Sequence, residues 1–150
     1  MKTIIFTLLL ISTYNSFSQD KRLFGKWKVT SVIGDDFYYN SENDSIYFSD
    51  KFKEAFNGNS EIIKEVEELT RKTYSNAFYF FDEKRNHRQM SNTAKDDFKY
   101  SINYEKTSIK INDYENNFLM FEIPYRFEND ILYLSLTQEM GTTNFELKRN

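Results

Sequence analysis

From Phe98 to the C-terminus the chain alternates apolar and polar residues with a period of two. Phe98, Tyr100, Ile102 and Tyr104 share one parity, and mostly polar residues lie between them. This alternation predicts β-strands with one buried face and one solvated face. The same pattern recurs in later stripes: Ile109 and Ile111; Leu119, Phe121, Ile123, Tyr125 and Phe127; Leu132, Leu134 and Leu136; Phe145 and Leu147.

The connections between these stripes are too short for crossover helices. Asn129-Asp130 is a two-residue turn whose members both tolerate positive φ, and residues 77–81 and 87–91 flank another polar turn. The pattern therefore predicts an antiparallel meander. Pro124 falls on the outward parity and lacks an N–H, so its strand needs a bulge or a free edge at that point.

Residues 60–73 follow a different period. Ile62, Ile63, Val66, Leu69 and Thr73 lie on one helical stripe, with charged residues on the other face. This arrangement predicts an amphipathic helix inserted before the meander, with Asn59 or Ser60 as its N-cap. The predicted fold is mainly β, an up-and-down antiparallel barrel with one helix. The alternative is an α+β roll, in which the helix covers an open curved sheet.

The N-terminus reads as a secretory signal. Lys2 precedes an apolar run over residues 3–11, and small residues Ser16 and Ser18 flank Phe17. The run is shorter than the roughly 20 residues that span a bilayer, so we expect cleavage after Ser18 and no transmembrane segment. Residues 19–150 then form one domain, periplasmic or secreted. The chain contains no cysteine, so we expect no lipoprotein anchor and no disulfide.

The charge and composition of the domain limit the classes of binding partner that we expect. Without Lys2 the domain has 19 basic and 23 acidic residues, a net charge of −4, which disfavours nucleic acid and anionic membranes. It carries 24 aromatic residues among 132, more than a minimal core requires. Aromatic side chains favour strands and give them bulky inward faces.

After the signal, Gly25 and Trp27 form a Gly-x-Trp motif that opens the first strand. This start resembles that of lipocalins, and more closely that of short lipocalin-like proteins exported by Bacteroidetes-type bacteria. The likeness spans residues 25–149 and includes the hairpin at 125–134 and the ending Phe-Glu-Leu-Lys-Arg at 145–149. The resemblance implies that Trp27 closes the barrel base and that Arg149 packs over it. Their parities agree with this, because Trp27 shares the inner face with Val29 and Ser31.

Catalytic motifs are absent from the sequence. It has one histidine, no phosphate-binding glycine loop, no nucleophile elbow and no His/Glu metal spacing. We interpret His87 as a surface or turn residue, and we expect no enzyme activity, no cofactor and no metal site.

The inward aromatic set remains as candidate chemistry. An eight-stranded barrel either fills with side chains or holds one small ligand. We expect a small hydrophobic or amphipathic molecule to bind between facing stripes, without turnover; the expected ligand-binding residues are Tyr100, Ile102, Tyr104, Phe121, Ile123 and Tyr125. The alternatives are a protein-interaction or inhibitor module with a filled core and, less favoured, a cofactor-free isomerase or hydrolase.

Overall fold

The computed structural model of the protein describes residues 20–139 and 141–150. The expected signal at 1–18 lies outside these described residues. A short 3₁₀ helix, η2 (Lys21–Leu23), leads into the first strand. The strands are β1 (Gly25–Ile33), β2 (Phe37–Asn40), β3 (Ser45–Phe48), β4 (Phe78–Phe81), β5 (Asn86–Met90), β6 (Lys95–Asn103), β7 (Ser108–Asn112), β8 (Leu119–Glu128), β9 (Ile131–Gln138) and β10 (Gly141–Arg149).

Eight of these strands close into an antiparallel barrel, as the meander predicts. Strands β4 to β10 pair in sequence order, and β1 joins β4 on one side and β10 on the other. The closure rules out the alternative open roll. Apolar side chains of alternate residues fill the interior, and buried members of this core come from β1, β4 and β6 to β10.

Strand β1 divides its pairing between two neighbours. Residues 25–28 pair with β4, whereas residues 31–33 pair with β2. The register against β10 shifts between Val29 and Ser31, so a β-bulge interrupts the alternation there. Val32 therefore joins the hydrophobic core, and the expectation that Ser31 continues the inner face fails at this bulge.

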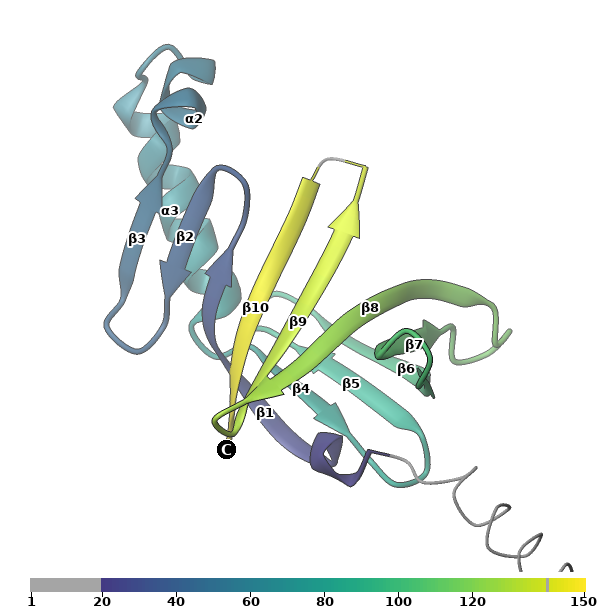
Figure 1. The fold of residues 1–150 in the computed structure, drawn as a ribbon. Coiled ribbons are helices and arrows are strands. Elements are labelled where there is room, and N and C mark those ends of the chain that lie inside the picture. Colours follow the sequence, from purple (N-terminus) through teal and green to yellow (C-terminus); the bar gives the residue numbers. More distant parts are fainter. Residues whose placement is uncertain (1–19, 140) are drawn as a thin grey trace, which may run out of the picture.

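The hairpin β2–β3 and two helices form a lobe to one side of the barrel (Figure 1). Helix α2 (Asp50–Ala55) is capped by Ser49, and helix α3 (Ser60–Tyr74) is capped by Asn59, whose side chain accepts from two backbone amides. The predicted helix is thus present, one residue longer than expected. None of its residues is fully buried, and Leu69 remains 58% exposed.

Trp27 and Arg149 meet at the closed end of the barrel. They are register partners on β1 and β10, and the Arg149 guanidinium lies 4.7 Å from the centre of the Trp27 ring. Arg149 also donates to the carbonyls of Phe24 and Arg22, and the Trp27 indole donates to the carbonyl of Leu23 at 2.7 Å. Gly25, at φ +119°, carries the chain into β1 beside Arg149.

At the opposite end the barrel wall opens between β8 and β9. Pairing between these strands runs only from Tyr125–Leu134 to Glu128–Ile131, although both strands continue beyond it. The Tyr125 N–H points away from β9, to the carbonyl of Thr107, so the N of Pro124 faces β9. Because proline has no N–H, the ladder ends there and β8 curves away from β9 (Figure 1). This is the free-edge alternative expected for Pro124; the bulge of β8 lies nearer its start, between the partners of Ile111 and Asn112.

Candidate ligand cavity in the barrel

A cavity of about 410 Å³ lies inside the barrel at this open end. Its wall includes Phe121 from β8 and Leu136 from β9. These residues lie on either side of the unpaired stretch between the two strands, beyond the Tyr125–Leu134 pair. The apolar part of its wall is formed by Phe98, Ile111, Met120, Phe121, Ile123, Leu134, Leu136 and Phe145. The volume is in the range of small-molecule sites.

The polar part of the wall is small and varied. It comprises Tyr79, His87, Gln89, Asp96 and Gln138. Gln89 and Asp96 are cross-strand partners on β5 and β6, and both are exposed, as is Gln138 near the end of β9. The described wall residues include no lysine and no arginine. A few polar groups on an apolar wall can orient an amphipathic ligand.

His87 is the most deeply buried polar group of the wall, at 2% exposure. Its ring stacks among those of Phe81, Tyr79 and Phe98, with the Phe81 ring centre 4.5 Å away. Burial lowers the pKa of His87 to about 4, so the imidazole is neutral at pH 7. The surface position expected for His87 is therefore wrong. The strand at 86–90 turns this side chain inward, next to the inward Phe81 of β4.

The structure separates the expected ligand-binding residues into two groups. Phe121 and Ile123 line the cavity. Tyr100 is buried nearer the closed end, where its hydroxyl donates to the carbonyl of Asp82 at 2.8 Å, and Ile102 is half-buried against the core. The Tyr125 hydroxyl donates to Asp20 at 3.2 Å.

Tyr104 lies in the turn that follows β6 and is 54% exposed. The described cavity wall thus includes neither Tyr104 nor the two buried tyrosines of the expected set. Phe98, which lies at the end of the same stripe as Tyr104, does belong to the wall.

Sequence reasoning missed the contribution of β5. His87 and Gln89 share a parity, and the charged Arg88 between them is exposed. This alternation could have shown that His87 and Gln89 face inward. Both residues are polar, however, so the stretch does not resemble the apolar stripe of a core strand. Phe145 and Leu136 were recognised as inward, yet their position at the open end depends on where β8 and β9 separate.

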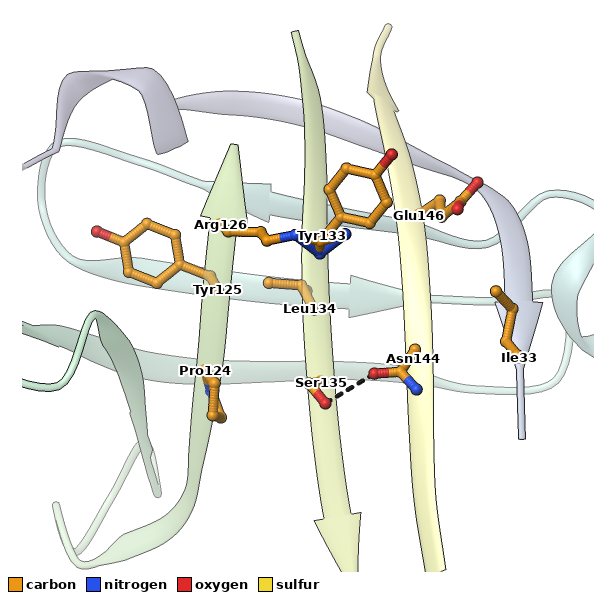
Figure 2. Close-up of a pocket in the computed structure, with 9 residues that line it drawn as sticks. All are labelled: Ile33, Pro124, Tyr125, Arg126, Tyr133, Leu134, Ser135, Asn144 and Glu146. Carbon is orange, nitrogen blue, oxygen red and sulfur yellow. Dashed lines mark hydrogen bonds between the residues drawn. The ribbon is translucent and has the colours of Figure 1, made fainter. Parts of the chain in front are cut away.

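A second hollow of about 320 Å³ lies on the outer face of β8, β9 and β10 (Figure 2). Four of its polar side chains contact one another in pairs: the Ser135 hydroxyl donates to the Asn144 side chain at 2.7 Å, and the Arg126 guanidinium lies 3.7 Å from the centre of the Tyr133 ring. Because these groups satisfy each other, the inner cavity is the better candidate site.

Within residues 20–139 and 141–150 no cluster of three or more His, Cys, Asp or Glu side chains could hold a metal ion. The described helices include none with the length and apolar character needed to cross a bilayer.

Together, the fold and the cavity define an eight-stranded antiparallel β-barrel with a partly apolar interior site. No protein-family profile and no curated protein matches the chain. Its structure is similar to the crystal structure of a DUF4847 family protein from Bacteroides vulgatus, with a TM-score of 0.52 and 12% sequence identity. The match covers 88% of this chain and 98% of the other. At this identity the likeness concerns the fold alone.

Proposed function

We propose that the protein is a carrier that binds one small hydrophobic or amphipathic molecule inside the barrel, without chemical turnover. The observation that carries the proposal is the 410 Å³ cavity inside the barrel, beside the gap between β8 and β9, with its apolar wall and polar rim. Burial of an apolar ligand there would gain roughly 25 cal/mol for each Å² removed from water.

The cavity favours a carrier over a module with a filled core. A barrel that served only as a scaffold for a protein partner would gain stability by filling its interior, because unfilled volume costs packing energy. Here bulky aromatic side chains fill the closed end, whereas the open end keeps an unfilled volume lined by Phe121, Leu136 and their neighbours. The opening beside Pro124 offers a route of entry.

A titration with N-phenyl-1-naphthylamine, an uncharged fluorescent probe, tests the proposal. We expect saturable binding of one probe to the wild type. Leu136→Trp places an indole in the cavity and should weaken binding by about tenfold or more, equivalent to about 1.4 kcal/mol. Thr137→Trp is the matched control, since the adjacent side chain on β9 points outward and is exposed.

Equal affinity of the wild type and both tryptophan variants would place the probe outside the cavity and contradict the proposal. Absence of saturable binding to the wild type would do the same. Thermal unfolding of each variant checks that the barrel is intact.

A further inference from the structure

Two polar groups on the cavity wall are left without a protein partner. Within the described part of the chain, no group forms a hydrogen bond with Nε2 of His87 or with the hydroxyl of Tyr79. The exposed fraction is 2% for His87 and 5% for Tyr79. Among the described residues only Ser31 Oγ is a fully buried side-chain polar atom without a partner, so both of these atoms keep some accessible surface and can bond to water or to a ligand in the cavity.

The contacts of the imidazole fix which nitrogen is available. Nδ1 of His87 lies 3.2 Å from the carbonyl oxygen of Phe80. A carbonyl oxygen can only accept, so Nδ1 carries the proton in this hydrogen bond. The ring is neutral at pH 7, and Nε2 is therefore an acceptor without a protein partner on a side chain that lines the cavity.

Tyr79 supplies the complementary group. Its ring stacks on that of His87, with a centre-to-centre distance of 5.5 Å. Burial raises the pKa of Tyr79, so its hydroxyl stays protonated and can donate. One acceptor and one donor thus belong to adjacent side chains on β4 and β5.

From this pair we infer that the cavity selects an uncharged lipophilic alcohol, whose hydroxyl donates to Nε2 of His87 and accepts from Tyr79. The inference rests on the carrier function proposed above and names its ligand class. A fatty-acid carboxylate fits poorly, because it offers no proton to Nε2. Moreover, the described wall residues include no lysine or arginine to balance its charge, and Asp96 lies at the rim.

The test compares two ligands with the same alkyl body, 1-decanol and decyl methyl ether, by displacement of N-phenyl-1-naphthylamine. The ether can accept a hydrogen bond but cannot donate one. We expect the wild type to bind the alcohol roughly tenfold more tightly than the ether. The bound ether would leave Nε2 of His87 without a donor, and an unpaired buried acceptor lowers affinity by about tenfold. Decanoate should also bind more weakly than decanol at pH 7.

The selectivity should depend on His87. In His87→Phe, which retains a ring for the aromatic stack, the ratio of alcohol to ether affinity should fall toward one. Arg88→Ala is the matched control on the same strand, because that side chain is exposed and points outward. It should keep the wild-type ratio.

A second readout needs no substitution. His87 is the only histidine of the chain, so the ring nitrogens give a single pair of ¹⁵N resonances in protein without a histidine tag. The Nε2 resonance should shift when decanol binds and stay in place with the ether.

The outcomes separate the two proposals. If decanol, the ether and the naphthylamine probe all fail to bind, the carrier function is wrong and this inference with it. If decanol and the ether bind equally, or if Nε2 does not respond to bound decanol, the carrier function stands and the inference is wrong.

Discussion

At the scale of single residues, Trp27 connects the two ends of the chain. The indole is 2% exposed, contacts Phe127 at 5.7 Å between ring centres, and lies under the Arg149 guanidinium. Its N–H is satisfied by the carbonyl of Leu23. The residue thus combines a large buried apolar surface with a complete set of polar contacts.

Trp27→Ala should therefore be strongly destabilising. Deletion of a buried aromatic side chain removes its transfer free energy and leaves a cavity, for an expected loss of about 3 to 5 kcal/mol in the free energy of unfolding. Urea denaturation measures this loss, and Lys28→Ala on the same strand is the control. A loss below about 1 kcal/mol would show that Trp27 does not hold the closed end.

His87 predicts a pH dependence of stability. Its pKa in the folded protein is about 4, against 6.5 for the unfolded chain, so between these values the unfolded state binds more protons. The contribution of His87 is complete above pH 6.5 and is lost as the pH falls toward 4. Its full size is about 3 kcal/mol.

Urea midpoints measured between pH 4 and 7 test this dependence. His87→Phe should lack the part of the slope that His87 contributes, whereas carboxylate titrations remain in both proteins. Identical slopes in the wild type and the variant would show that His87 is not buried in its neutral form.

At the scale of elements, helix α3 contrasts with the barrel strands. Its cap and its span match the sequence prediction, and Glu67 and Arg71 form an ion pair on its surface, yet its apolar stripe is only partly covered. Amphipathic periodicity therefore predicted the helix but did not reveal how little of it the barrel buries. The burial of α3 depends on how the lobe with the β2–β3 hairpin packs beside the barrel. This hairpin was not predicted from the sequence.

The contrast makes a quantitative prediction. Leu69→Ala on α3 should cost less than about 1 kcal/mol, because the side chain is already 58% exposed. Leu132→Ala on β9 removes the same atoms from a site with 0% exposure and should cost about 2 to 5 kcal/mol. Equal costs in urea denaturation would mean that α3 packs against a surface absent from this structure.

The strands show what periodicity can and cannot predict. Alternation correctly predicted the buried residues Ile109, Leu132 and Leu147, because a period of two follows from backbone geometry alone. It failed at Ser31, where a bulge shifts the register. It also could not locate the cavity along the stripes, because its place depends on where β8 leaves β9, at Pro124.

At the scale of the whole molecule, the barrel has two unlike ends. The closed end is packed with aromatic rings and tied by Arg149 to the backbone before β1. The other end holds the cavity, with a lateral opening between β8 and β9 that follows from the missing N–H of Pro124. One end provides stability and the other leaves volume for a ligand.

The central claim is that a small molecule binds within this volume. Intermolecular NOEs between bound 1-decanol and the methyl groups of Ile123, Leu134 and Leu136 test it most directly. Our account predicts NOEs from the alkyl chain to these three inward residues of β8 and β9. NOEs confined to the exposed residues Phe118 and Leu119, or none at all at saturating ligand, would contradict it.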